Sequence, residues 1–212
     1  MLIALAAVML AQTFTLQPSD DLWVYPHASE PGTDVFLRVW GAEGKAAPSN
    51  AGEAESYSMA FLKWSLVGMP TASKLTGAKL ILTQVAKPGY SLQQAKDMPL
   101  EARGVPAMFA ETDWKYESLE AFLPKAGKDD VYGSGYPETI GGDTVNISID
   151  LLKGKGFADT LAKALHDPKK EIAIGLTSAM DMAELGRSSI YKIYSRDERD
   201  EKLRPKLVLI FD

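Results

Sequence analysis

Apolar and polar residues alternate in short runs along most of the chain. Residues 34–40 are one example, because Leu37 and Val39 fall on one side of an extended chain while Arg38 and Trp40 fall on the other. A period of two is the spacing of a β-strand that is buried on one face. We therefore expect a strand in residues 34–40, with Leu37 and Val39 in the core.

The same pattern recurs in other short segments that are bounded by Gly, Pro, Asn or Asp. They are residues 59–66, 78–82, 145–150, 171–176 and 189–195. Residues 206–211 are apolar on both faces, which predicts a covered, central strand. Many short strands in one chain favour a sandwich or barrel over an α/β fold.

Helical spacing of apolar residues is scarce. Residues 157–166 show it and are followed by Asp167-Pro168, which would end a helix. Residues 118–123 predict a further helical turn, whereas residues 41–56 and 125–144 are rich in Gly, Pro, Ser and Asp and are expected to be loops. The sequence thus predicts an all-β fold, a two-sheet antiparallel jelly-roll β-sandwich with one or two short helices in the connections.

The amino terminus indicates export. Leu2 to Leu10 is an uninterrupted apolar run followed by Ala11-Gln12-Thr13, which fits the h-region of a signal peptide and is shorter than the roughly 20 residues that span a bilayer. We expect a signal peptide in residues 1–15 and a single sandwich domain in residues 16–212, secreted or at the cell surface, without a transmembrane segment in the mature chain. The alternative is a buried first strand or helix within residues 1–15.

Composition narrows the classes of partner and chemistry. The 212 residues are 46% hydrophobic, enough for one sizeable core. Lys and Arg total 23 against 28 Asp and Glu, a net charge of -5, so no overall positive field attracts nucleic acid. The chain has no cysteine, which excludes disulfides, thiolate nucleophiles and thiolate metal sites, but does not identify the compartment.

Several segments, in order along the chain, match a known pattern. They are residues 34–38, 61–64 and 78–82, Trp114 with Glu117, residues 147–150, Ser195-Arg196-Asp197 and Arg204-Pro205-Lys206-Leu207. Together they resemble the DNRLRE-type domain, a jelly-roll module that is classified among carbohydrate-binding modules and is common in exported bacterial proteins. The chain departs from that pattern at Trp64-Ser65, where Phe-Asp is usual, and at Asp197, where Glu is usual. The resemblance implies a jelly-roll fold and carbohydrate binding.

Few residues suit catalysis. The two histidines, His27 and His166, lack the spacing of a histidine metal site. Gly133-Ser134-Gly135 lacks the nucleophile elbow and predicts a flexible turn. Tyr191 to Tyr194 faintly resembles the Tyr and Lys strand of jelly-roll polysaccharide lyases, but the histidine strand that those enzymes need is missing. We therefore predict that the chain is not an enzyme.

A binding surface has more positive support. If Leu37 and Leu62 face the core, a strip of aromatic and basic side chains projects from the opposite faces of their strands: Phe36, Arg38, Trp40, Tyr57, Phe61 and Lys63. Aromatic rings stack on sugars, and Arg and Lys pair with carboxylates or sulfates. We predict Arg38, Trp40, Tyr57 and Lys63 as ligand contacts. The alternative is that another sheet or a loop buries the aromatic rings, and Trp64 and Trp114 are assigned to the core.

Two other features concern ions. Asp20, Asp21, Asp143 and Asp181 lie in oxygen-rich segments expected to be loops and are candidate ligands of a structural calcium, although none forms an EF-hand spacing. Residues 196–206 alternate basic and acidic side chains, which predicts a solvated hairpin or a salt-bridge cluster.

These observations predict a non-catalytic extracellular module that binds a polysaccharide, plausibly an anionic one. The alternative is a structural or adhesive protein of the cell surface or matrix, whose partner is a component of the cell envelope and not a glycan. An enzyme such as a polysaccharide lyase or hydrolase is the third reading, and it would require a cleft with perturbed Tyr, His or Lys groups.

Overall fold

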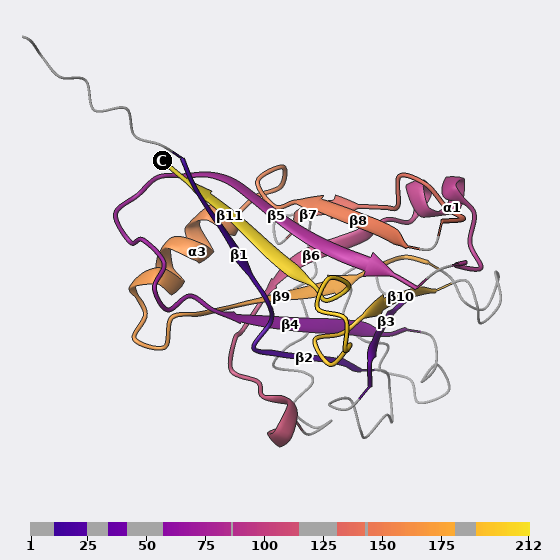
Figure 1. Cartoon of the computed structure of the whole chain (residues 1–212), viewed down its shortest axis with the longest axis horizontal. Coiled ribbons are helices and arrows are strands. Elements are labelled where there is room, and N and C mark those ends of the chain that lie inside the picture. Colours follow the sequence, from indigo (N-terminus) through magenta and orange to yellow (C-terminus); the bar gives the residue numbers. More distant parts are fainter. Residues whose placement is uncertain are drawn as a thin grey trace, which may run out of the picture.

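Two antiparallel β-sheets pack face to face in the computed structural model (Figure 1). The structure describes residues 11–24, 34–41, 57–85, 87–114, 131–142, 144–180 and 190–212. Among these residues the only α-helices are two short ones, α1 (Leu92–Asp97) and α3 (Phe157–His166). The predicted all-β, two-sheet antiparallel sandwich with short helices in its connections is therefore confirmed.

Sheet A has the order β1-β11-β5-β10-β3, with β8 on the other side of β5. Its strands are β1 (Gln12–Leu16), β3 (Phe36–Val39), β5 (Leu75–Gln84), β8 (Val145–Asp150), β10 (Tyr191–Tyr194) and β11 (Lys206–Phe211). The strand predicted at residues 206–211 is interior to the sheet, paired with β1 and β5, but its outward side chains are only partly buried.

Sheet B has the order β2-β4-β9-β6-β7. Its strands are β2 (Asp20–Val24), β4 (Met59–Ser65), β6 (Leu100–Val105), β7 (Val131–Gly135) and β9 (Glu171–Thr177). Two isolated bridges, Trp40 with Ser58 and Pro137 with Ile147, link the sheets. The sandwich is thus hydrogen-bonded across the edge formed by β3 and across the edge formed by β8.

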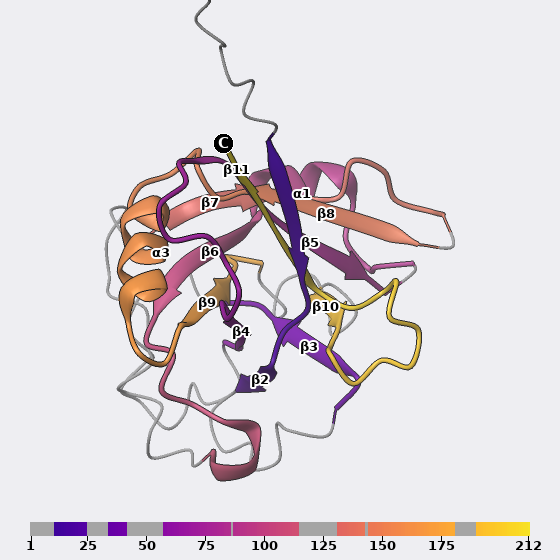
Figure 2. The same ribbon diagram turned by 60° about the vertical axis from the view of Figure 1, so that its left-hand side comes forward.

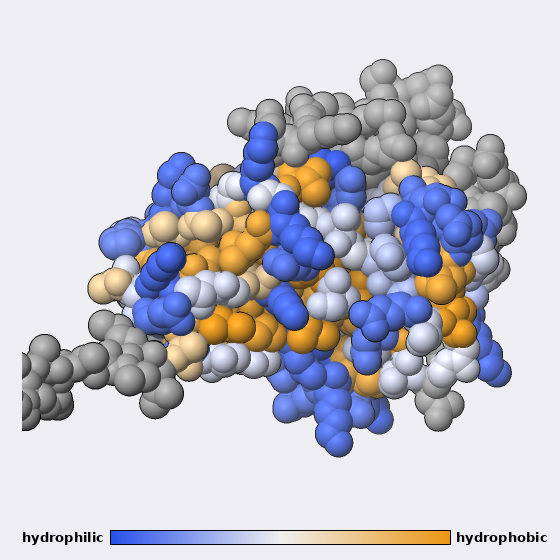
Figure 3. Space-filling view, turned by 90° about the horizontal axis from the view of Figure 1, so that it is seen from above, coloured by the Kyte–Doolittle hydropathy of each residue, from blue (hydrophilic) through white to orange (hydrophobic). Residues whose placement is uncertain are grey.

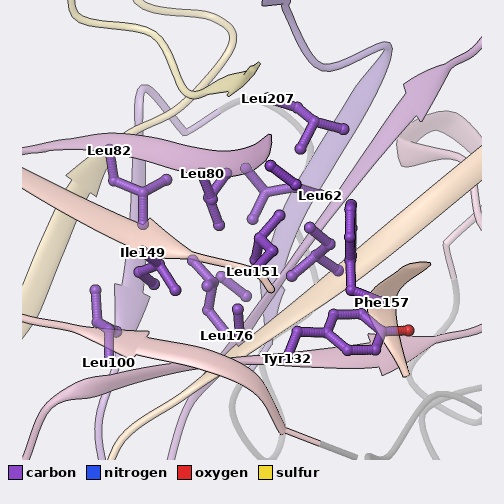
Figure 4. Close-up of a cluster of buried hydrophobic side chains, with 14 of the residues drawn as sticks. Leu62, Leu80, Leu82, Leu100, Tyr132, Ile149, Leu151, Phe157, Leu176 and Leu207 are labelled. Atoms are coloured by element: carbon purple, nitrogen blue, oxygen red, sulfur yellow. The ribbon is translucent and has the colours of Figure 1, made fainter. Parts of the chain in front are cut away.

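The core between the sheets follows from the period-two pattern. Leu62 and Trp64 of β4 meet Leu80 of β5, Ile149 of β8 and Leu207 of β11, and all are fully buried (Figure 4). Phe157 of α3 is also buried in this cluster, which explains why the apolar face of that helix has the spacing seen in the sequence. The helix predicted at residues 157–166 is therefore confirmed with its bounds.

A second apolar cluster covers the outer face of sheet B. Phe61 and Met59 of β4 and Leu22 of β2 are buried there beneath Phe109, which follows β6, and Trp114 packs against the same cluster. Phe61 lies 6.1 Å from the Phe109 ring and 6.1 Å from the Trp114 ring, measured between centroids. Alternation of apolar and polar residues predicts burial of only one strand face, so it misses this packing, in which both faces of β4 are covered.

Several elements differ from the sequence expectations. β7 lies within residues 125–144, which were predicted to be loop, and α1, β2 and β6 were not predicted. α1 begins with a capping box, because the Ser91 hydroxyl accepts from the Gln94 N–H and the Gln94 side chain accepts from the Ser91 N–H. The helical turn expected at residues 118–123 and most of the loop expected at residues 41–56 lie outside the described residues.

The amino-terminal boundary also differs. β1 pairs with β11 from Gln12 opposite Phe211 to Leu16 opposite Leu207, so a boundary after residue 15 would cut a strand of sheet A. Figure 2 shows β1 running alongside β11 at the edge of sheet A. Phe14 of β1 also packs against Phe211 at 5.9 Å between ring centroids. The apolar run expected to be the h-region, Leu2 to Leu10, lies outside the described residues.

Candidate functional site

The predicted aromatic and basic strip is not displayed as one exposed surface. Of the four predicted ligand contacts, Trp40, Tyr57 and Lys63 are 6%, 2% and 6% exposed, and Arg38 alone is partly exposed. Tyr57 belongs to the second apolar cluster on the outer face of sheet B, beneath Phe109. For Tyr57 and Lys63 the physical reason is the packing of Phe109 over the outer face of sheet B, whereas Trp40 packs against Trp23 at 6.5 Å between ring centroids. The four predicted contacts therefore do not form one exposed strip.

Lys63 is held by protein groups. Its Nζ lies 3.0 Å from Asp20 Oδ2, donates to the carbonyl oxygen of Phe109 and sits 5.3 Å from the centroid of the Phe109 ring. A buried ammonium requires such partners because desolvation of an unpaired charge is costly. Lys63 therefore fastens the segment after β6 to the outer face of sheet B.

A different pair of rings is partly exposed on sheet A. Phe36 of β3 and Tyr194 of β10 are cross-strand neighbours whose ring centroids are 5.4 Å apart, with an interplanar angle of 47°. Since Leu37 and Ile193, the adjacent residues, point into the core, Phe36 and Tyr194 project from the outer face of the sheet. Both side chains are only partly buried.

Two cations lie beside these rings. Lys192 Nζ is 4.1 Å from the centroid of the Phe36 ring, within the range of a cation–π contact. Arg38 is opposite Lys192 in the register of β3 and β10, and its guanidinium pairs with Asp34 and lies 4.5 Å from the centroid of the Trp23 ring. We call Phe36, Arg38, Lys192 and Tyr194 the aromatic–cation surface.

Part of this surface was visible in the sequence. Phe36 and Arg38 belong to the strip predicted from alternation, whereas Lys192 and Tyr194 were noted only for their faint likeness to a lyase strand. The missing information was that β10 pairs with β3, two strands about 150 residues apart in sequence. Figure 3 shows one face of the molecule, on which hydrophobic areas lie between hydrophilic side chains.

A second group of charged residues joins the two sheets at the start of β2. Asp21 accepts from the N–H of Arg196 at 2.7 Å, and the N–H of Asp21 donates to Glu111 Oε1 at 3.0 Å. Arg196 Nε lies 3.3 Å from Glu111 Oε1 and 3.7 Å from Asp197 Oδ1. We call Asp21, Glu111, Arg196 and Asp197 the carboxylate cluster. It connects β2, the 3-10 helix η3 (Glu111–Asp113) and the segment after β10.

The Ser195-Arg196-Asp197 motif therefore holds the segment after β10 against the rest of the sandwich. Ser195 is fully buried and its N–H donates to the carbonyl of Val35 at 2.9 Å. Farther along, Arg204 Nε donates to the carbonyl of Glu198 at 2.7 Å, which folds residues 196–206 onto themselves. The salt-bridge reading of this charged segment is supported by the ion pair of Arg204 Nη1 with Glu201 Oε1 at 3.4 Å and by that of Arg196 with Asp197.

Burial sets the protonation of the cluster. Desolvation raises the pKa of Asp21 well above its usual value, and the hydrogen bond from Arg196 N–H only partly opposes this. Desolvation also raises the pKa of Glu111, against the hydrogen bond from Asp21 N–H and the charge of Arg196. The protein thus favours the protonated carboxyl at a position where the unfolded chain ionises readily.

Replacing Asp21 with Asn should make stability less dependent on pH. A raised folded-state pKa means that the folded protein binds more protons than the unfolded chain, so the stability associated with protonated Asp21 is present at low pH and is lost as pH rises through the folded pKa. Asp21→Asn, whose amide oxygen can still accept from Arg196 N–H, should gain stability relative to wild type as pH rises. Urea unfolding from about pH 4 to about pH 8 measures this.

The matched control is Glu138→Gln, which removes a carboxylate that is exposed after β7. It should leave the wild-type pH dependence unchanged. If Asp21→Asn and wild type lose stability in parallel as pH rises, burial does not control the protonation of Asp21 in the folded protein.

The expected calcium ligands are distributed differently from the prediction. Asp20 and Asp21 lie in β2 and not in a loop, and they are engaged by Lys63 and by Arg196. Asp143 and Asp181 lie outside the described residues. Within the described segments, no group of three or more His, Asp or Glu side chains is arranged to hold a metal ion.

The residues considered for catalysis have local roles. Tyr191 is buried, and its hydroxyl donates to the carbonyl of Met98 at 3.0 Å. Burial raises the pKa of this phenol, which opposes a role as a general base. His166 Nδ1 lies 2.8 Å from the carbonyl of Ala162 at the end of α3, and His27 lies outside the described residues. Ser134 is an outward residue of β7, so the predicted flexible turn is wrong.

Comparisons with known proteins leave the chain without an assigned family. No family model matches it, and no curated protein matches its sequence. The resemblance to the DNRLRE-type domain therefore stays a prediction. Over the residues that the structure describes, none of the helices has the length and apolarity needed to cross a membrane.

Proposed function

We propose that this chain is a non-catalytic extracellular module that binds a polysaccharide through the aromatic–cation surface. The observation that carries the proposal is the pair formed by Phe36 and Tyr194, 5.4 Å apart between ring centroids and partly exposed on the outer face of sheet A. Aromatic side chains are more often packed than displayed, so two neighbouring rings on a solvent-facing sheet suggest a contact surface.

The chemistry of this pair suits a sugar. Rings offer flat apolar faces with a polar edge, and sugar rings offer flat C–H faces with polar edges, so the two can stack while their hydroxyl groups stay solvated. The rings are supported from below by the paired backbones of β3 and β10. Because a surface on paired strands is held in place before binding, little conformational entropy is lost when a ligand docks.

The neighbouring cation favours an acidic sugar. Lys192 Nζ lies 4.1 Å from the centroid of the Phe36 ring, so a carboxylate or sulfate on a stacked sugar would be within reach of its ammonium group. The protein as a whole has a net charge of -5, so attraction at this surface would be local. Binding through Lys192 should therefore weaken as salt rises.

Replacing Tyr194 with Ala should lower polysaccharide affinity by about tenfold, because one of the two stacking faces is lost. Affinity electrophoresis against neutral and acidic polysaccharides, with calcium and with chelator, measures the change. The matched control is Tyr136→Ala: Tyr136 is 39% exposed and also has a lysine nearby, with Lys96 Nζ at 6.0 Å from its ring centroid. This control should bind as wild type does.

Three results would contradict the proposal. If none of the polysaccharides slows the protein in affinity electrophoresis, the alternative of a structural or adhesive surface protein is favoured. Equal loss in Tyr194→Ala and Tyr136→Ala would place binding elsewhere. A fall in the chain length of a glycan during incubation would indicate an enzyme. Equal unfolding midpoints of the two variants establish that a change in affinity does not come from unfolding.

A further inference from the structure

The two cations of the aromatic–cation surface are not equivalent. Arg38 forms an ion pair with Asp34, and both side chains are 25% exposed. Lys192 has no carboxylate partner among the described residues, although it is the cross-strand neighbour of Arg38. A ligand that approaches Phe36 and Tyr194 therefore meets one available positive charge next to a fixed carboxylate.

Asp34 is held in this place by the backbone. Its Oδ1 accepts from the N–H of Phe36 at 3.2 Å, while Oδ2 pairs with Arg38 Nη1. Turning the carboxylate away would break both contacts. The guanidinium of Arg38 is fixed in turn, because it lies 4.5 Å from the centroid of the Trp23 ring. Asp34 is thus held at the start of β3, where its carboxylate occupies the guanidinium of Arg38.

We propose that Asp34 keeps Arg38 occupied and thereby restricts the aromatic–cation surface to glycans with isolated anionic groups. The preferred class is a polysaccharide with one carboxylate per disaccharide. In such a chain the carboxylate binds Lys192, and the neighbouring uncharged sugar lies near Asp34. Densely sulfated chains and chains with a carboxylate on every sugar are disfavoured. This inference rests on the proposed function and names the substrate class of the same surface.

Charge spacing is the physical basis of this selectivity. The Debye length is about 8 Å at physiological ionic strength, so an anionic group of the ligand would feel the Asp34 carboxylate only where the glycan passes within about that distance of it. Such a like charge disfavours binding, and Arg38 cannot compensate while it pairs with Asp34. An uncharged sugar in the same position has no such penalty.

The test uses Asp34→Asn, whose side-chain oxygen can still accept from Phe36 N–H. The probes are hyaluronan, with one carboxylate per disaccharide, polygalacturonate, with one on every sugar, heparin, with several sulfates per disaccharide, and a neutral glucan. Wild type should bind hyaluronan best. Asp34→Asn should bind heparin and polygalacturonate about three- to fivefold more tightly than wild type, with hyaluronan affinity changed less than about twofold.

The control is Asp159→Asn, which removes the same charge from an exposed position on α3, at the end of the molecule away from β3 and β10 (Figure 1). It should leave all four affinities unchanged. Equal gains in the two variants, no gain in Asp34→Asn, or wild-type binding of heparin as tight as that of hyaluronan would overturn the inference while leaving polysaccharide binding intact. Failure to bind any probe would overturn the proposed function as well.

Discussion

Gly133→Ala is expected to lower the free energy of unfolding by about 3 kcal/mol or more. A Cβ atom added at Gly133 would lie 2.2 Å from the carbonyl oxygen of Asp150 and 3.2 Å from Ile149 Cγ2. The first contact is with backbone, at the place where β7 of sheet B passes β8 of sheet A, so no side-chain rotation relieves it. The two strands would have to move apart, which would disturb the bridge between Pro137 and Ile147.

Chemical unfolding followed by tryptophan fluorescence measures this loss, and Gly142→Ala is the matched control. A Cβ at Gly142 would meet only the carbonyl of Thr144, at 3.4 Å, an ordinary contact. The control should stay within about 0.5 kcal/mol of wild type. If both variants unfold at the same denaturant concentration as wild type, the close approach of β7 and β8 does not exist in solution.

Gly133 also lies in a strand, β7, that could not be predicted from the sequence. The sequence predicts a flexible turn at Gly133-Ser134-Gly135, within the loop expected at residues 125–144, whereas the structure has the strand Val131–Gly135 there. β7 is a strand because β6 pairs with it on one side and because small residues let β8 come close on the other. Neither neighbour is local in sequence, and strand propensity depends strongly on such context.

The strands that alternation predicted line the main core, although β6 and β7, which were not predicted, line it as well. Leu62 and Trp64 of β4 lie two residues apart, and so do the buried residues around Leu80 of β5. Their burial in the main core could therefore be inferred from spacing alone. The same reasoning could not reveal that the other face of β4 is covered as well. That cover comes from Phe109 and Trp114, and no periodic pattern marks a segment that packs as irregular chain.

The exposed strip on which the predicted ligand contacts were based is not formed, for the same reason. Tyr57 and Lys63 lie on the outer face of sheet B as the alternation required, but the cover over that face buries them. Phe36 and Arg38 lie on sheet A, where the outer face stays partly exposed. Strand faces could be predicted from local spacing, whereas the choice of which face remains open to ligand depended on contacts between distant segments.

Asp20→Ala is expected to destabilise the protein by about 3 kcal/mol, because it leaves the buried ammonium of Lys63 without its counter-ion. The side chains of Lys63 and Asp20 are 8% and 21% exposed, so the lysine is the partner that water cannot reach. Its remaining contact with the Phe109 carbonyl cannot neutralise the charge. Urea unfolding with a fitted m-value measures the loss.

Lys63→Met is the contrasting variant and should change stability by less than about 1 kcal/mol. Replacing a buried ion with an apolar side chain of similar shape removes a desolvation cost together with the attraction, and the two nearly cancel. Asp20 would still be partly solvated, and its Oδ1 would still lie 3.4 Å from the N–H of Glu111. An exposed carboxylate substitution, Glu138→Ala, gives the baseline for a lost surface charge.

The comparison separates two roles for Lys63. If the ammonium fastens the segment after β6 to sheet B through its charge, Asp20→Ala and Lys63→Met must differ as described, because only the first leaves an unpaired charge in the interior. Equal, large losses would indicate that the packing of the lysine methylenes beside Phe109 holds the segment instead. Equal, small losses would mean that the pair is solvated and that the segment after β6 does not close over it, which would reopen the outer face of sheet B as a ligand surface.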